Sequence, residues 1–304
     1  MTSGEWEGEA AQLYFWLMAA RDARIRLDEW LVRHGNASSR EQARALVLAG
    51  RVHLAGSIQP KPGLRIPEST PVSVDEGPRF ASRGGLKLAH ALERFDLDVR
   101  GRICADLGAS TGGFTDCLLQ QGAERVYAVD VGYGQLDWRL RQDPRVVVME
   151  RTNARYLEPL PEPIDLVTID VAFISLRLVL PPARRILRPS GEIVALVKPQ
   201  FEAGKGQVGK GGVVRDPAIH REVLISIADW LAREGYALCD LTASPLLGPA
   251  GNVEFLAHIE IGIMDHGSGS GSGQSEESTG AAIPEAQALM VERALDEAQQ
   301  LRDH

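Results

Sequence analysis

Short hydrophobic runs alternate with amphipathic stretches along most of the chain after about residue 100. The runs are rich in Val, Ile, Leu and Ala, which is typical of strands buried on both faces of a sheet. The stretches between them repeat their apolar positions at helical spacing. The predicted strands are 102–109, 125–131, 145–150, 165–172, 192–198, 236–246 and 254–261, and the predicted helices are 112–121, 134–142, 176–187 and 218–234.

This alternation predicts an α/β domain with a mostly parallel sheet covered by helices on both faces, a Rossmann-like fold. The last two predicted strands, 236–246 and 254–261, follow each other with no helix between them. Consecutive strands joined by a short connection pair antiparallel. We therefore expect one antiparallel strand at the edge of the sheet.

A second, smaller pattern occupies residues 24–79 and predicts a small α+β domain. Two short amphipathic helices are expected, the first with Leu27, Trp30 and Leu31 on one face. The second starts after an N-cap at Ser38 or Ser39. Two short strands should follow, in "RVHLAG" and "PVSVDEG".

The small domain resembles the ribosomal protein S-four-type RNA-binding domain. The resemblance rests on Arg26-Leu27-Asp28, Ser39-Arg40 and Gly50-Arg51-Val52, which match its R-L-D, S-R and G-x-V elements. The four arginines assigned to RNA phosphates are Arg26, Arg40, Arg44 and Arg51. The alternative is that these arginines only solvate exposed helix faces.

Charge is unevenly distributed in a way that fits this assignment. The chain has a net charge of −8, yet residues 24–83 carry ten basic and six acidic side chains. The acidic excess lies in the flanking segments and conceals a basic module suited to a polyanion.

The remaining segments complete the predicted domain organisation. We expect residues 1–23 to be an extension, disordered or artefactual, and "GSGSGSGQSEESTG" to be a disordered linker. The acidic helix after the linker should be marginal and dispensable. The expected order is extension 1–23, RNA-binding domain 24–79, hinge 80–86, catalytic domain 87–264, linker 265–283 and acidic helix 284–304.

Cysteine usage and hydropathy exclude several classes of protein. The three cysteines form no C-x-x-C pair, which disfavours a disulfide framework or a structural zinc site, so we expect no metal. No apolar run approaches the roughly 20 residues that cross a membrane. The apolar segment 13–20 follows acidic residues, where a secretory signal has basic ones. We expect a cytoplasmic protein with no membrane partner.

A glycine-rich turn, "ADLGASTGGFTD", follows the first strand of the large domain and leads into a helix. It does not fit the dinucleotide pattern G-x-G-x-x-G, and Asp130 ends the next strand, where a carboxylate can bind ribose hydroxyls. These features favour an adenosyl ligand such as S-adenosylmethionine over a generic βα turn. The candidate cofactor residues are Asp106, Gly108, Ala109, Ser110, Thr111, Gly112, Gly113, Phe114, Asp130, Asn153 and Asp170.

Four charged residues lie at chain positions that a folded sheet would bring together. Lys87 precedes the first strand in "SRGGLKL", Asp170 and Lys198 follow the fourth and fifth strands, and Glu254 begins the last. Ligands of open α/β sheets bind at the carboxyl ends of the strands. The lysine that ends an apolar strand is unfavourable there unless it is paired.

These positions match the Lys-Asp-Lys-Glu tetrad of FtsJ-like (RrmJ-like) 2′-O-ribose methyltransferases. Residues 24–262 as a whole resemble the TlyA family, once called hemolysins, in stretches such as "SRGGLKL", "DLVTIDVAFISL" and "LVKPQFEAGKGQVGKGGVVRD". The resemblance implies a class I methyltransferase sheet and S-adenosylmethionine as cofactor. It also implies cytidines of small- and large-subunit ribosomal RNA as targets, read in assembled subunits.

In this chemistry a base must remove the proton of a ribose 2′-hydroxyl while it attacks a methyl group. We assign Lys198 as that base, with Asp170 and Glu254 orienting the two lysines. Burial and the charge of Lys87 favour loss of its proton, whereas the carboxylates act in the opposite sense. The alternative is two unrelated ion pairs.

The segment "EAGKGQVGKGG" at 202–212 resembles a phosphate-binding P-loop but has Gly211 where that motif needs Ser or Thr. We interpret it as a mobile lid over the substrate, with Lys205, Lys210 and the nearby Arg215 binding the RNA backbone. Arg83, in the predicted hinge, is a further RNA contact.

Three other functions remain open on the sequence: a non-catalytic RNA-binding protein, a membrane-active cytolysin and a base methyltransferase. The cysteine pair or Asn/Asp-Pro-Pro-aromatic motif that base methylation usually requires does not occur in the chain.

Overall fold

The computed structural model describes residues 24–54, 60–75, 77–262 and 284–303. The chain divides into a small unit that ends at Arg79 and a large unit that begins at Phe80. The predictions for residues 1–23 and for the linker at 265–283 lie outside the described residues.

In the part of it that the structure describes, the small unit has two helices and two pairs of short antiparallel strands. Leu27 and Leu31 are fully buried between the helices, as their helical spacing predicts. Ser39 is the N-cap of the second helix, where its hydroxyl accepts a hydrogen bond from the Gln42 amide. The elements are β1 (Arg24–Arg26), α2 (Leu27–Arg33), α3 (Arg40–Leu48), β2 (Val52–Leu54), β3 (Arg65–Pro67) and β4 (Val72–Val74); β1 pairs with β3, and β2 with β4.

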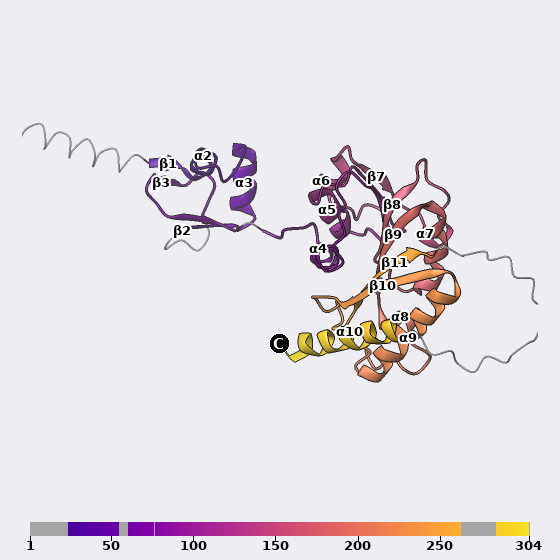
Figure 1. The fold of residues 1–304 in the computed structure, drawn as a ribbon. Helices are drawn as coiled ribbons and strands as arrows, with labels where there is room; N and C mark the ends of the chain where they lie inside the picture. Colours follow the sequence, from indigo (N-terminus) through magenta and orange to yellow (C-terminus); the bar gives the residue numbers. More distant parts are fainter. Residues whose placement is uncertain (1–23, 55–59, 76, 263–283, 304) are drawn as a thin grey trace, which may run out of the picture. The chain divides into compact units, whose positions relative to one another are not determined.

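The large unit is built on a seven-stranded sheet in the order β10-β11-β9-β8-β5-β6-β7 (Figure 1). Each strand overlaps one that the hydrophobic runs predict, so the Rossmann-like fold class is confirmed. The strands are β5 (Ile103–Leu107), β6 (Arg125–Val129), β7 (Val146–Met149), β8 (Ile164–Ile169), β9 (Leu187–Val197), β10 (Tyr236–Ala243) and β11 (Phe255–Ile261).

The expected antiparallel strand is β11, which runs against both β9 and β10. It lies one position in from the edge, because β10 pairs along its outer side. This insertion places the start of β11 beside the end of β9, with Phe255 opposite Val197.

Helices cover both faces of the sheet. Leu88 of α4, Cys117 of α5 and Leu140 of α6 pack on one face, and helices α7, α9 and α10 pack on the other. The helices and 3₁₀ turns are α4 (Gly84–Arg94), α5 (Gly113–Gln120), α6 (Trp138–Gln142), η1 (Ala154–Tyr156), η2 (Leu176–Leu178), α7 (Leu180–Ile186), α8 (Pro199–Glu202), α9 (Pro217–Arg233) and α10 (Glu285–Asp303).

The predicted hinge at 80–86 is wrong, because this segment belongs to the core of the large unit. Phe80 is buried, and the Ala81 amide donates a hydrogen bond to the Asp116 carboxylate. Gly84 and Gly85 form the first turn of α4. A Cβ at Gly85 would lie within about 2.6 Å of the Phe80 ring, so glycine is needed for close packing and not for flexibility.

The C-terminal helix exists as predicted, but it is not a marginal appendage. Val291 and Ala294 of α10 are fully buried in the same hydrophobic core as α9 and β10. The helix therefore contributes to the folded large unit.

Candidate functional site

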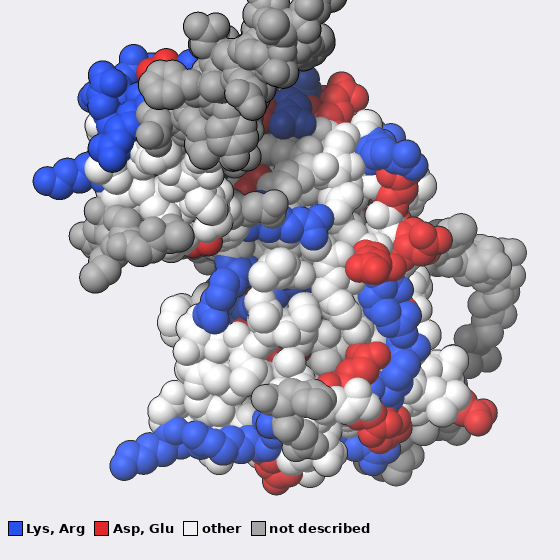
Figure 2. Space-filling model, turned by 90° about the vertical axis from the view of Figure 1, so that its left-hand side faces the viewer, with Lys and Arg blue, Asp and Glu red and all other residues white. Residues whose placement is uncertain are grey.

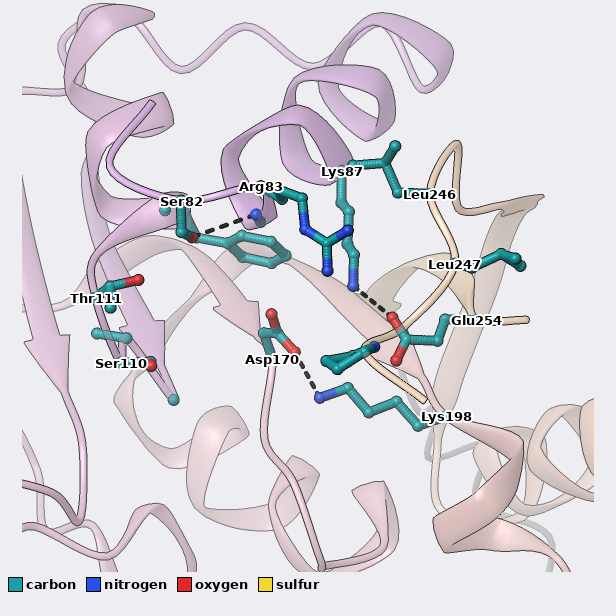
Figure 3. A pocket seen from close by; sticks show the side chains of 16 residues that line it. Ser82, Arg83, Lys87, Ser110, Thr111, Asp170, Lys198, Leu246, Leu247 and Glu254 are labelled. Atoms are coloured by element: carbon teal, nitrogen blue, oxygen red, sulfur yellow. Dashed lines mark hydrogen bonds and ion pairs between the residues drawn. The ribbon is translucent and has the colours of Figure 1, made fainter. Parts of the chain in front are cut away.

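The fold brings all four predicted catalytic residues to one cavity of about 240 Å³ (Figure 3). Lys87 extends from α4, Asp170 follows β8, Lys198 follows β9, and Glu254 precedes β11. These positions meet because the parallel strands end at the same edge of the sheet and antiparallel β11 begins there.

The four side chains form two ion pairs that face each other across the cavity. Lys198 Nζ lies 2.7 Å from Asp170 Oδ1, and Lys87 Nζ lies 2.5 Å from Glu254 Oε2. The second pair is nearly closed to solvent, whereas Asp170 keeps about a quarter of its side chain exposed. The Asp170–Lys198 pair is therefore the more accessible of the two, mainly through Asp170.

A second cavity of about 600 Å³ lies on the other side of Asp170 and Lys198. Gly108, Ser110, Asp170 and Lys198 line both cavities. The two spaces thus meet at the Asp170–Lys198 pair, so groups bound in each could react there.

The predicted ribose ligand, Asp130, stands in the second cavity at the end of β6. Its carboxylate accepts hydrogen bonds from the Ser110 amide at 2.8 Å and the Gly132 amide at 2.6 Å. Asn153 also lines this cavity. A Cβ at Gly108 would lie 2.5 Å from the Asp170 carbonyl oxygen, so the loop approaches β8 closely only with glycine there.

The residues of the glycine-rich turn fall into three groups, according to which of the two cavities they line. Ser110 and Gly108 contribute to both cavities, whereas Asp106 and Gly112 are absent from the lining of either. The residues that line only the first cavity are Ala109, Thr111, Gly113 and Phe114.

Asp106 lies fully buried behind the turn. Its Oδ2 accepts hydrogen bonds from the Thr115 amide at 2.9 Å and the Thr115 hydroxyl at 2.7 Å, which holds the first turn of α5 against β5. Burial raises the pKa of the Asp106 carboxyl to about 7, although these hydrogen bonds oppose the rise. Asp106 therefore supports the turn from behind and lines neither cavity.

The raised pKa predicts a pH dependence of stability. The folded state binds the Asp106 proton more tightly than the unfolded chain, whose pKa is near the ordinary value of 3.8. The stabilising contribution is complete below that value and is lost as pH rises through about 7. Urea unfolding of Asp106→Asn should therefore show a flatter dependence on pH between about 4 and 7 than the parent protein.

Asp98→Asn is the matched control, because Arg100 lowers the pKa of exposed Asp98 to about 2, below this window. An Asp106→Asn profile that overlays the parent profile would show that Asp106 does not titrate in this range.

In the small unit, three of the four predicted RNA-binding arginines surround one buried carboxylate. Asp28 is fully buried and lies 2.7 Å from Arg26, 3.4 Å from Arg40 and 3.7 Å from Arg44. Arg51 lies elsewhere and donates to the Asp75 carbonyl oxygen. The clustered arginines remain more than a third exposed at their side chains, so their outer donors can reach a phosphate.

The segment at 202–212, the glycine-lysine loop, does not have the structure of a P-loop. The next helix, α9, begins at Pro217, six residues after Gly211, so no helix N-terminus faces the loop where a phosphate would bind. Lys205, Lys210 and Arg215 are exposed. They do not line either cavity, whereas the Arg83 side chain extends into the first one (Figure 3).

Sequence reasoning missed Phe173, three residues after Asp170. Its side chain is 91% exposed, and its backbone has a φ of 63°, which is unusual for a residue other than glycine. Its ring lines the second cavity and packs on Phe201 at 5.2 Å between ring centroids. An exposed aromatic residue in a strained backbone beside a site is a signal that only the structure provides.

On the face shown in Figure 2, several Lys and Arg side chains lie beside Asp and Glu side chains. In the large unit, Arg141 pairs with Glu150 and Arg145 with Asp143. Among the described residues, no helix is both long and apolar enough to cross a membrane.

One cluster bears on the prediction that the protein holds no metal. Glu192, His258 and Glu260 have ligand atoms within 4.8 Å of one another, away from both cavities. Glu192 pairs with Arg102 and His258, and these ion pairs account for the position of its carboxylate.

Comparison with known proteins gives the same division of the chain. Residues 80–260 match the FtsJ-like methyltransferase family, and residues 25–72 match the S4 domain. The 16S/23S rRNA (cytidine-2′-O)-methyltransferase TlyA of Mycobacterium tuberculosis is 50% identical over 236 residues, which cover 76% of this chain and 88% of that protein. A Bacillus subtilis protein, YqxC, named as a candidate rRNA methyltransferase, is 52% identical over 77% of this chain and 85% of its own length. A solved structure from Streptococcus thermophilus, described as a candidate hemolysin, has a TM-score of 0.64 and 42% identity, and covers 92% of this chain and 99% of that one.

Proposed function

Because the chain belongs to the TlyA family of FtsJ-like methyltransferases, we propose that it methylates the ribose 2′-hydroxyl of cytidine in ribosomal RNA, with S-adenosylmethionine as methyl donor. The observation that carries this proposal is the meeting of two cavities at the Asp170–Lys198 pair. One cavity suits the cofactor, and the other suits the nucleotide that receives the methyl group.

The second cavity fits S-adenosylmethionine in size and in polar groups. Asp130 is held rigidly by two backbone amides, in the position where a carboxylate can accept the ribose hydroxyls. Asn153 stands on the same wall for the adenine edge. When bound, the cofactor supplies an electrophilic methyl group.

Lys198 is the base in this proposal. Its Nζ stands on the wall shared by both cavities, where it can take the proton of a 2′-hydroxyl. Asp170, at 2.7 Å, holds the amine in place, and the more deeply buried Lys87–Glu254 pair fixes the opposite wall. Lys198 would accept the hydroxyl proton in its neutral form. The cofactor, when bound, would supply a methyl group whose carbon–sulfur bond breaks as the bond to the hydroxyl oxygen forms, with S-adenosylhomocysteine as the leaving group.

RNA binding is divided between the units. The arginines around Asp28 suit phosphates, since guanidinium groups held by a carboxylate lose little freedom on binding. Exposed Phe173 offers a flat face at the rim of the second cavity, on which an unpaired base can stack.

The proposal is tested by incubating the protein with methyl-labelled S-adenosylmethionine and, separately, small subunits, large subunits and naked ribosomal RNA. Label in RNA from at least one of these supports it. Calorimetry that shows no binding of the cofactor, together with no transfer, would favour the non-catalytic alternative, since a protein that only binds RNA has no need of the cofactor. Leakage of protein-free liposomes at low micromolar concentration would favour the cytolysin.

The glycine-lysine loop provides a further prediction. Replacing both Lys205 and Lys210 with Ala should weaken RNA binding. It should also reduce the slope of log affinity against log salt concentration by about two, because each phosphate contact releases counterions. Affinity for S-adenosylmethionine should not change. An unchanged RNA affinity, measured across a salt series, would show that the loop does not bind RNA.

A further inference from the structure

The C-terminal helix α10 lies beyond residue 260, where the match to the FtsJ-like family ends. Its buried residues, Val291, Ala294 and Ala298, pack with α9 and β10. The helix therefore has a defined position on the large unit, and its polar contacts indicate which segments it holds in place.

Along its length, α10 binds backbone groups of β10, the strand at the open edge of the sheet. Glu297 Oε2 accepts a hydrogen bond from the Ala243 amide at 2.9 Å and from the Thr242 hydroxyl at 2.7 Å. Arg293 donates to the Leu241 carbonyl oxygen at 2.8 Å. These contacts satisfy edge groups that would otherwise need water or another strand, and they fix the helix in register with β10.

At its C-terminal end, α10 contacts a different segment, the two residues Val214 and Arg215 that follow the glycine-lysine loop (residues 202–212). Arg302 donates to the Arg215 carbonyl oxygen at 2.8 Å and to the Val214 carbonyl oxygen at 3.4 Å. Val214 is fully buried, and its carbonyl oxygen is also bound by the His220 ring at 3.1 Å. The chain is therefore anchored just after the loop, at Val214.

The same anchor is tied to the segment that carries Glu254. The buried Asn252 side chain accepts a hydrogen bond from the Val214 amide and donates one to the Gly212 carbonyl oxygen, both at 2.9 Å. Asn252 precedes Glu254 by two residues. A continuous series of contacts thus joins α10, through Val214 and Asn252, to the segment that carries Glu254. Glu254 in turn pairs with Lys87.

We propose that α10 acts in cis as a clamp on the glycine-lysine loop, with Arg302 as its positioning residue. The clamp holds the exposed Lys205, Lys210 and Arg215 where an RNA backbone can bind them. This inference rests on the proposed function for its substrate, RNA, but the clamping contact itself does not.

The test compares Arg302→Ala with the full-length parent protein in two measurements. Hydrogen exchange of the peptide that contains Val214 should become roughly fivefold faster, the factor expected for loss of about one hydrogen bond. In methyl-transfer kinetics, KM for ribosomal RNA should rise by a similar factor while kcat and cofactor affinity stay within about twofold. Arg302→Lys, which keeps a positively charged donor group, should show smaller changes in both measurements than Arg302→Ala.

Glu292→Ala is the matched control, because it removes an exposed ion pair between α10 and Arg221 of α9 and leaves the loop contacts intact. Equal exchange in Arg302→Ala and Glu292→Ala would overturn the clamp. So would a fall in kcat and cofactor affinity that matches the rise in KM, since that indicates general destabilisation. Faster exchange confined to Arg302→Ala supports the clamp even if no RNA is methylated, in which case the proposed function alone fails.

Discussion

Replacing Lys198 with Ala should reduce methyl transfer to ribosomal RNA by about 10²- to 10⁴-fold, the range typical of a lost general base. The physical reason is that Lys198 Nζ is the basic atom on the wall shared by both cavities and is held there by Asp170 at 2.7 Å. The Asp130 contacts lie on another strand, so affinity for S-adenosylmethionine should fall little. Single-turnover transfer of a labelled methyl group measures the rate, and calorimetry measures the affinity.

The matched control is Lys205→Ala, which removes an exposed lysine of the loop that follows Lys198. Its single-turnover rate at saturating RNA should stay within a few-fold of the parent rate. If Lys198→Ala retains near-parent turnover, Lys198 is not the base. If it loses cofactor binding in proportion to rate, its role is structural.

Replacing Val291 with Asp should lower the free energy of unfolding of the large unit by about 3 kcal/mol or more. Val291 is fully buried where α10 packs on α9 and β10, so the new carboxylate would lose its water and displace the helix. Urea or thermal unfolding measures the change.

Leu289→Asp is the control, because Leu289 lies on the same helix with its side chain 65% exposed. Its unfolding midpoint should stay close to that of the parent protein. Similar midpoints for the two variants would show that α10 is as dispensable as its sequence suggests.

The contrast between α10 and the sheet shows where sequence reasoning succeeds. Strands β5 and β8 are mostly apolar, with one or two polar residues each, and an amphipathic helical stretch follows each of them in the chain. Their positions, and the convergence of Asp170 and Lys198 at the carboxyl ends of parallel strands, could therefore be predicted. In α10, by contrast, the buried stripe is made largely of alanines such as Ala294 and Ala298. Alanine buries little area per residue, so nothing in the pattern distinguishes a packed helix from a solvated one.

Helix α4 was missed for a related reason. Gly84 and Gly85 have low helix propensity and suggest a linker, but close packing requires glycine where Gly85 meets Phe80. The burial of Asp106 and the exposure of Phe173 could not be predicted from the sequence either. Both depend on the direction in which a side chain points near the end of a strand, which the pattern of residues does not give. Asp170, Lys198 and Glu254 could be predicted to meet because strand topology brings them to one edge of the sheet, whereas Lys87 extends from α4 and was assigned through the family resemblance.

In the proposed function the site methylates a ribose hydroxyl and not a base. The decisive measurement is to digest the methylated ribosomal RNA to nucleosides and identify the labelled product by mass spectrometry, with Lys198→Ala as the blank. We expect 2′-O-methylcytidine, with the label on the ribose fragment. Label on the cytosine ring, or on no nucleoside in either subunit, would show that the proposed function is wrong.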